Sequence, residues 1–292
     1  MLRPLFILLP LLLCLTGCKR ASTGSVGLPP PERVSTYEVR GVLRKSIPGS
    51  TKAVIAHEAI PGYMEAMTME FTVGDAAGLS GLQMGDAISF RLNVTDDRSW
   101  IDRVQKIAAV PQVLAPPAPG ETKALPPGTA LPDCALVDSR GAPLHLHEFQ
   151  GRAFAFTFIF TRCPLPDFCP RMNSHFSVVQ RALAAAAPDT KWQLLCISLD
   201  PEFDTPARFD EYATRSRPDT ARWTFATGKL ADIEPFARAC GLQVARGGAL
   251  PEHNLRTVVV DTEGHVQKTF MGNEWTPEEL VAEMQRAMKT GR

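Results

Sequence analysis

Residues 154–170 read FAFTFIFTRCPLPDFCP and decide the fold of the C-terminal half of the chain. The first seven residues form an almost unbroken apolar run, which is typical of a strand buried on both faces of a sheet. Cys163 and Cys169 follow in a proline-containing loop, and 172–187 is predicted to be a helix with Pro170 near its first turn. Because open α/β sheets bind ligands at the carboxyl ends of their strands, the two thiols are expected to form a functional site.

Strands and helices alternate through the C-terminal domain, which is expected to span residues 133–292. A turn signal at 261–264 is expected to join the last two strands into a hairpin. This alternation predicts an α/β sheet, and the order of the elements matches a thioredoxin-like fold. Further strands are expected at 194–199, 223–226, 255–260 and up to residue 270, and further helices at 206–215, 230–239 and from residue 276.

A second domain is expected at residues 36–108. Five short β-prone runs separated by turn signals predict a small all-β barrel of the OB-like kind. Residues 109–132 then contain seven prolines, which predicts a stiff linker between the two domains.

The N-terminus predicts export and a lipid anchor. Residues 1–17 hold an apolar run about half as long as a membrane span, which is typical of a signal peptide. The run ends in Leu15-Thr16-Gly17-Cys18, which resembles a bacterial lipobox. On that interpretation Cys18 carries lipid, Cys14 is removed and 18–35 is a tether; the alternative is an ordinary cleaved signal. The chain is then expected in an oxidising, extracytoplasmic space on the periplasmic side, with the choice between inner and outer membrane open.

The charge balance excludes one class of partner. Lys and Arg total 31, and Asp and Glu also total 31, so the formal net charge is zero. Nucleic-acid-binding proteins carry a basic excess that neutralises phosphates, so no nucleic-acid partner is expected.

The cysteine motif resembles that of the Sco/SenC family, thioredoxin-fold copper proteins involved in cytochrome oxidase assembly. The resemblance spans about residues 131–288 and includes SLDPEFDTP at 198–206. It implies that Cys163, Cys169 and His253 bind copper, and two thiolates with one imidazole form a soft ligand set suited to copper. The family's common motif separates its cysteines by three residues, whereas five intervene here.

The helix dipole is expected to favour a thiolate at Cys169, which lies at the expected helix N-terminus. A structural disulfide between Cys163 and Cys169 is the alternative to a metal site.

The remaining cysteines and one pair of histidines are expected to have no metal-binding role. Cys134, Cys196 and Cys240 are expected to be small packing residues, with a Cys196–Cys240 disulfide left open. His145 and His147 alternate on an expected strand, and we expect both to be solvated.

A histidine and two methionines indicate a second site in the expected barrel. Met67 and Met69 are two residues apart in a β-prone run, so both thioethers project from one face. A preceding strand can place His57 opposite them. Thioethers bind monovalent copper and survive oxidising conditions, whereas a methionine stripe without the histidine would be interpreted as core.

This segment resembles the CusF-like periplasmic copper-binding domain of bacterial copper efflux systems, over about residues 36–108. The resemblance implies that His57, Met67 and Met69 bind copper. Met64 stands where well-known members of that family place a tryptophan, and its role as a third thioether ligand is left open.

Together the two resemblances predict a membrane-anchored extracytoplasmic copper metallochaperone. The expected partners are the membrane, through lipid on Cys18, and a copper-accepting oxidase subunit or another copper protein. We hypothesise that the barrel captures copper, as Cu(I) or Cu(II), and passes it to the cysteine pair. The alternatives are a thiol-disulfide oxidoreductase that uses Cys163 and Cys169 to reduce a copper-accepting subunit, and a copper buffer for tolerance.

Overall fold

The structure is a computed structural model, which describes residues 33–46, 51–64, 66–108, 123–187, 191–216, 218–246 and 250–290. The predicted signal peptide, Cys18 and residues 109–122 of the predicted linker lie outside the described residues. Among the helices that are described, none combines the length and the apolar character needed to cross a bilayer.

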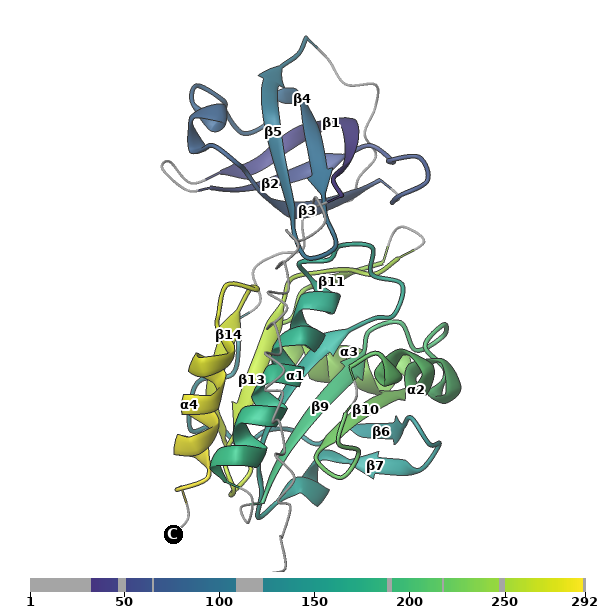
Figure 1. The fold of residues 1–292 in the computed structure, drawn as a ribbon, viewed down its shortest axis with the longest axis vertical. Coiled ribbons are helices and arrows are strands. Elements are labelled where there is room, and N and C mark those ends of the chain that lie inside the picture. The colour runs from purple at the N-terminus through teal and green to yellow at the C-terminus, as the bar shows by residue number, and fades with distance from the viewer. Residues whose placement is uncertain are drawn as a thin grey trace, which may run out of the picture. The chain divides into compact units, whose positions relative to one another are not determined.

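The N-terminal sheet has five antiparallel strands in the order β3-β2-β1-β4-β5 (Figure 1). A bridge between Val73 and Ile101 links the end of β3 to β5 and curls the sheet toward a barrel. The predicted small all-β domain is therefore confirmed. Its elements are β1 (Ser35–Ser46), β2 (Lys52–His57), β3 (Met67–Thr72), the 3₁₀ turn η1 (Ala76–Leu79), β4 (Ala87–Val94) and β5 (Ser99–Lys106).

The C-terminal sheet has seven strands in the order β14-β13-β8-β9-β10-β6-β7. Strands β8, β9 and β10 run parallel, and the antiparallel pair β13 and β14 forms the predicted terminal hairpin. The strands are β6 (Ala135–Asp138), β7 (Pro143–His145), β8 (Ala153–Ile159), β9 (Trp192–Ser198), β10 (Trp223–Gly228), β13 (Arg256–Val260) and β14 (Val266–Met271). A separate ribbon pairs β11 (Val244–Ala245) with β12 (Glu252–His253).

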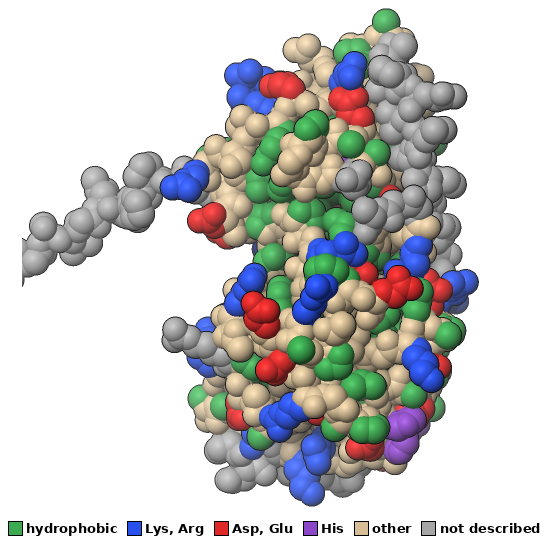
Figure 2. All heavy atoms as spheres, turned by 90° about the vertical axis from the view of Figure 1, so that its right-hand side faces the viewer, with side chains coloured by type: hydrophobic (Ala, Val, Ile, Leu, Met, Phe, Trp, Pro, Cys, Tyr) green, Lys and Arg blue, Asp and Glu red, His purple; other side chains and the backbone are tan. Residues whose placement is uncertain are grey.

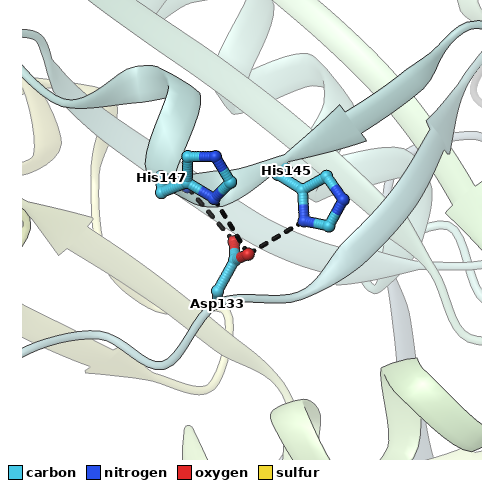
Figure 3. A group of neighbouring side chains, drawn as sticks. All are labelled: Asp133, His145 and His147. Carbon is cyan, nitrogen blue, oxygen red and sulfur yellow. Dashed lines mark hydrogen bonds and ion pairs between the residues drawn. The ribbon is translucent and has the colours of Figure 1, made fainter.

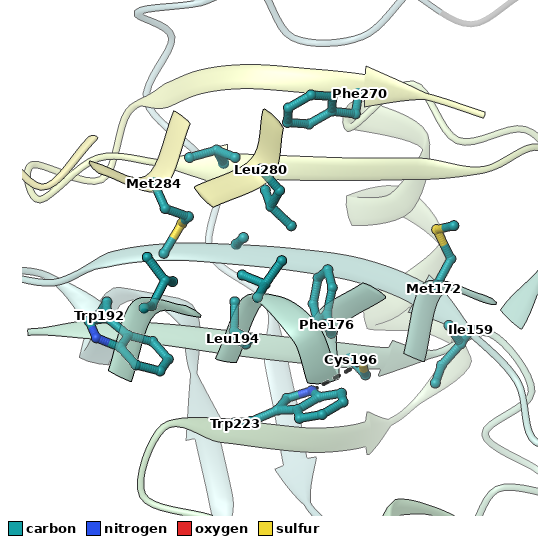
Figure 4. Packing of buried hydrophobic residues seen from close by; sticks show 14 of the residues in the cluster. Ile159, Met172, Phe176, Trp192, Leu194, Cys196, Trp223, Phe270, Leu280 and Met284 are labelled. Atoms are coloured by element: carbon teal, nitrogen blue, oxygen red, sulfur yellow. Dashed lines mark hydrogen bonds between the residues drawn. The ribbon is translucent and has the colours of Figure 1, made fainter. Parts of the chain in front are cut away.

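Helices cover both faces of this sheet and confirm the thioredoxin-like α/β architecture. Side chains from α1, α2 and α4 share one apolar layer with the sheet, and α3 packs on the other face. Figure 4 shows Phe176 of the first layer close to Leu194 of β9. The helices are α1 (Cys169–Ala186), α2 (Pro206–Thr214), α3 (Leu230–Ala239) and α4 (Pro277–Ala287), with the 3₁₀ turn η2 (Leu146–Phe149).

Strand β8 carries the apolar run that predicted this fold, and all seven of its residues are buried. Because side chains alternate along a strand, its aromatic residues face the α3 layer and its alanines face the α1 layer, where their small size lets the helix approach. The first set is Phe154, Phe156 and Phe158, and the second is Ala153 and Ala155.

Residues 123–132, the last part of the predicted linker, contact the C-terminal domain. Leu125 and Leu131 pack against the apolar layer that contains α3, and Ala130 forms a bridge with His265. On the face drawn in Figure 2, basic and acidic side chains are interspersed, which fits the zero formal net charge.

The loop between the two cysteines packs against the N-terminal sheet. Leu165 is 5% exposed and belongs to the same apolar cluster as Phe71 and Phe90 of the barrel. Cys163 and Phe168 contact both this cluster and the one beneath α1. The two sheets fall within one compact unit that begins at residue 33, so this loop is an apolar contact inside that unit.

We predict that Leu165→Ala lowers the free energy of unfolding by about 2–4 kcal/mol, because it leaves a cavity among packed apolar side chains. The measurement is chemical denaturation, with Met84→Ala as the control. Met84 is 73% exposed, so its truncation should change stability by less than about 0.5 kcal/mol. Equal stabilities for the two variants would contradict the contact.

Candidate metal centre

Cys163 and Cys169 lie where β8 gives way to α1. Cys169 is the first residue of α1 and completely buried, whereas Cys163 is partly exposed. Both thiols are free, and the Cys169 thiol hydrogen-bonds to Cys163. The loop therefore presents two neighbouring soft donors, of which Cys163 is the more accessible.

The two thiols differ in acidity. Burial acts to raise the pKa of Cys163, but hydrogen bonds from the Cys169 thiol and from backbone groups at Cys169 and Leu165 outweigh it and lower that pKa. Burial, together with the hydrogen bond to Cys163, raises the pKa of Cys169 well above its ordinary value. The expectation of a thiolate at Cys169 is wrong, because burial and the hydrogen bond to Cys163 both raise the pKa of that thiol; the thiolate is favoured at Cys163.

A buried carboxylate fixes the stem of the loop. Asp204 accepts hydrogen bonds from the Thr161 backbone N–H at 3.2 Å, from the Thr161 hydroxyl, and from the Ser198 hydroxyl at 2.6 Å. Burial raises the pKa of Asp204, and these hydrogen bonds act against that rise. Thr161 lies two residues before Cys163, so this network sets the position from which the loop begins.

Arg162 adds a second anchor. Its Nε and Nη2 atoms donate to Asp200 at 2.9 and 2.6 Å. Both acidic residues belong to the 198–206 segment, which the sequence marked only through a family resemblance. Its structural role is to hold the residues just before Cys163.

His253 lies on β12, opposite Val244 of β11. Its Nδ1 is 2.7 Å from the carbonyl oxygen of Asn254; since a carbonyl only accepts, Nδ1 carries the proton and Nε2 keeps its lone pair. Burial, reinforced by the charge of Arg246, lowers the pKa of His253 to about 4. A neutral imidazole with one unprotonated nitrogen is the form that binds metals.

His57 of β2 has the same arrangement in the barrel. Its Nδ1 is 2.7 Å from the carbonyl oxygen of Glu58, and its buried Nε2 has no hydrogen-bond partner in the part of the chain that the structure describes. Burial lowers the pKa of His57. A buried unpaired nitrogen is costly, and a bound soft cation would satisfy it. His57 lies directly opposite Met67 in the β2–β3 register, so one imidazole and one thioether are neighbours as the sequence predicted.

The methionines divide into two kinds. Met67 and Met69 of β3 line a cavity, with Met67 8% exposed. Met64 is 6% exposed, forms a bridge with Ile60 and packs in the apolar core of the barrel. It is not among the residues that line the cavity, which favours a packing role.

The cavity that Met67 and Met69 line is also lined by Cys163 and His253. Its volume is about 40 Å³, which accommodates an ion or a few water molecules but is too small for an organic substrate. The structure thus brings residues of both predicted sites to one cavity. His57 and Cys169 do not line it, but they are adjacent to the lining residues Met67 and Cys163 respectively.

Three hydrogen bonds link the barrel to the C-terminal domain, two of them through residues that line the cavity. They run from the Tyr63 hydroxyl to the Pro164 carbonyl (3.1 Å), from the Ser99 hydroxyl to Asp167 Oδ1 (2.9 Å) and from the Thr68 N–H to Glu252 Oε2 (3.2 Å). Pro164 and Asp167 both lie between the cysteines, so the five-residue spacing gives the loop the length with which it contacts the barrel.

Sequence reasoning missed Glu252. It is 4% exposed and lines the cavity, and its Oε1 has no hydrogen-bond partner among the described residues. Desolvation raises its pKa. Its position next to the predicted ligand His253 was the available sequence signal for Glu252. Its contact with Thr68 could not be predicted, because the two residues are 184 apart in the chain.

The three other cysteines among the described residues are buried and free, so the Cys196–Cys240 disulfide that the sequence left open is not formed. Cys196 accepts a hydrogen bond from Trp223 Nε1 at 3.4 Å (Figure 4). Cys134 and Cys240 pack in the layer beneath α3, as expected for small apolar residues.

Two family models match the chain. The SCO1/SenC model matches residues 125–289, and the model of the copper binding periplasmic protein CusF matches residues 36–106. These matches identify copper as the metal that the chain handles, and the second supports an extracytoplasmic location.

Individual relatives match the C-terminal domain. The SCO1 protein homolog of Bacillus subtilis is 28% identical over 152 residues, which are 50% of this chain and 77% of that protein. The mitochondrial SCO2 homolog of Mus musculus is 25% identical over 157 residues, 53% of this chain and 60% of that protein. A solved SCO1/SenC family lipoprotein from Bacillus anthracis shares the fold, with a TM-score of 0.51 and 23% identity over 57% of this chain and all of that one.

Methionine substitutions separate ligands from core residues. In a Cys163→Ser/Cys169→Ser background, we expect Met67→Leu and Met69→Leu each to weaken Cu(I) binding at least about tenfold, because each removes a thioether of the predicted site. Met64→Leu should keep the affinity, because leucine fills the same core position. Competition with a Cu(I) chelator measures all three. If Met64→Leu weakened binding as much as Met67→Leu, Met64 would be a ligand.

Proposed function

We propose, since the chain belongs to the SCO1/SenC family, that it is a copper metallochaperone that delivers its cargo to a copper centre of a respiratory oxidase. Copper is held by Cys163, Cys169 and His253 in the C-terminal domain. A second copper site lies in the N-terminal domain and is formed by His57, Met67 and Met69.

The observation that carries this proposal is the shared cavity. Met67, Met69, Cys163 and His253 all line it, so a copper ion can exchange thioether for thiolate ligands without leaving the protein. Cys163 is the partly exposed thiol and the one with the lowered pKa. It is therefore the thiolate that first replaces a methionine, and Cys169 and His253 complete the set.

The direction of transfer follows from ligand chemistry. Both thioethers and thiolates favour Cu(I), but an anionic thiolate binds it more strongly than a neutral thioether. Copper captured by the barrel therefore moves toward the cysteine pair. A passive copper buffer would need no such convergence of two ligand sets.

A thiol-disulfide oxidoreductase is the second candidate, and the lowered pKa of Cys163 favours it. His253 and the two methionines have no role in that reaction, although they line the same cavity. We therefore rank metal transfer first. The lipid anchor on Cys18 and the attachment of the chain to a membrane are part of the same proposal.

His253→Ala distinguishes the two functions. We expect it to weaken Cu(I) binding at the cysteine pair at least about tenfold, because it removes one of three ligands, and to leave reduction of a disulfide substrate unchanged. Cu(I) competition and a thiol-exchange assay measure the two effects. If His253→Ala kept the copper affinity while Cys163→Ser abolished activity on the disulfide, the chain would be an oxidoreductase.

A further inference from the structure

Three polar side chains of the C-terminal domain lie close together at a point away from the cavity (Figure 3). The Nδ1 atoms of His145 and His147 lie 2.8 and 2.9 Å from the same oxygen, Asp133 Oδ2. The ligand atoms of the three residues all lie within 4.8 Å of one another. The expectation that the two histidines are merely solvated missed this convergence, because Asp133 precedes them by 12 and 14 residues.

The cluster sits on the edge of the sheet. His145 ends the edge strand β7, His147 lies in η2, and Asp133 precedes β6. Four strand spacings separate β7 from β8, which is roughly 19 Å at the usual spacing. The cluster is therefore distinct from the cavity at Cys163.

The distances fit one metal ion. Two ligands bound at about 2.1 Å and at right angles lie about 3.0 Å apart, close to the two observed N···O separations. The side chains of His145 and His147 are 43% and 59% exposed, so solvent and ions can reach them. Cys134, the next residue after Asp133, points inward and donates to the Asp232 carbonyl, so the donor set contains no thiolate.

We propose that Asp133, His145 and His147 form a third metal site, for a divalent cation of the Cu²⁺ type. Two imidazoles and one carboxylate suit Cu²⁺, which forms the strongest complexes among the divalent ions of the first transition row. When the ion binds, each Nδ1 proton moves through solvent to Nε2 of the same ring, and each hydrogen bond to Asp133 is replaced by a metal bond.

The same contacts could serve only to tie η2 to the segment before β6. The two roles differ in what they bind, since a structural tie needs no metal. Another partly exposed histidine of this domain provides a matched comparison: His265 Nδ1 lies 3.8 Å from Asp261 and 3.7 Å from Glu263. It has carboxylates nearby but no second imidazole within that group.

The test is Cu²⁺ titration followed by electron paramagnetic resonance. Cys163→Ser/Cys169→Ser protein is used so that those thiols do not reduce the ion, and its fold is checked by circular dichroism. We expect His145→Ala and His147→Ala each to remove one equivalent of nitrogen-coordinated Cu²⁺, and His265→Ala to remove none. Because the test uses no Cu(I) and no cysteine ligand, its result is separate from the chaperone proposal.

An unchanged Cu²⁺ stoichiometry in His145→Ala and His147→Ala would overturn the third site, as would an equal loss in His265→Ala. If the serine background does not fold, Zn²⁺ titration of the reduced wild-type chain and of His147→Ala asks the same question, because Zn²⁺ does not oxidise thiols. An equal number of bound Zn²⁺ ions in those two proteins would then reject the site.

Discussion

The position of the Cys163 loop is the constraint on which the rest of the structure depends. At its stem, Asp204 holds Thr161 through two hydrogen bonds. At its tip, Leu165 is buried in the apolar cluster of the barrel. A loop fixed at its stem and at its tip keeps Cys163 in one place. A metal site requires this, because the ligand positions must match metal–ligand bond lengths within a few tenths of an ångström.

This double anchoring explains the unusual cysteine spacing. Pro164 and Asp167, which lie between the cysteines, accept hydrogen bonds from Tyr63 and Ser99 of the barrel. The longer loop thus positions the two thiols and also contacts the N-terminal domain. Apolar packing at Leu165 supplies stability to the contact, while the polar bonds fix its orientation.

The sequence predicted the two sets of candidate ligands better than the contact that brings them to one cavity. The apolar run of β8, the cysteines after it and the pairing of His57 with Met67 follow from periodicity over a few residues. The shared cavity does not, because it depends on contacts such as Thr68 with Glu252, 184 residues apart. The acidity of Cys169 was predicted wrongly for a related reason: the position at a helix N-terminus follows from local sequence, but the burial and the hydrogen bond to Cys163 that raise the pKa of Cys169 do not.

On the proposed function, copper passes from the barrel to the thiols of the same chain. The direct measurement starts with the Cys163–Cys169 pair oxidised and Cu(I) bound to the barrel. An equal amount of reduced Met67→Leu chain is added, the disulfide is reduced, and native mass spectrometry follows the copper. The account predicts that copper stays on the chain that carried it and moves to its own thiols; early, equal sharing between the two chains would contradict it.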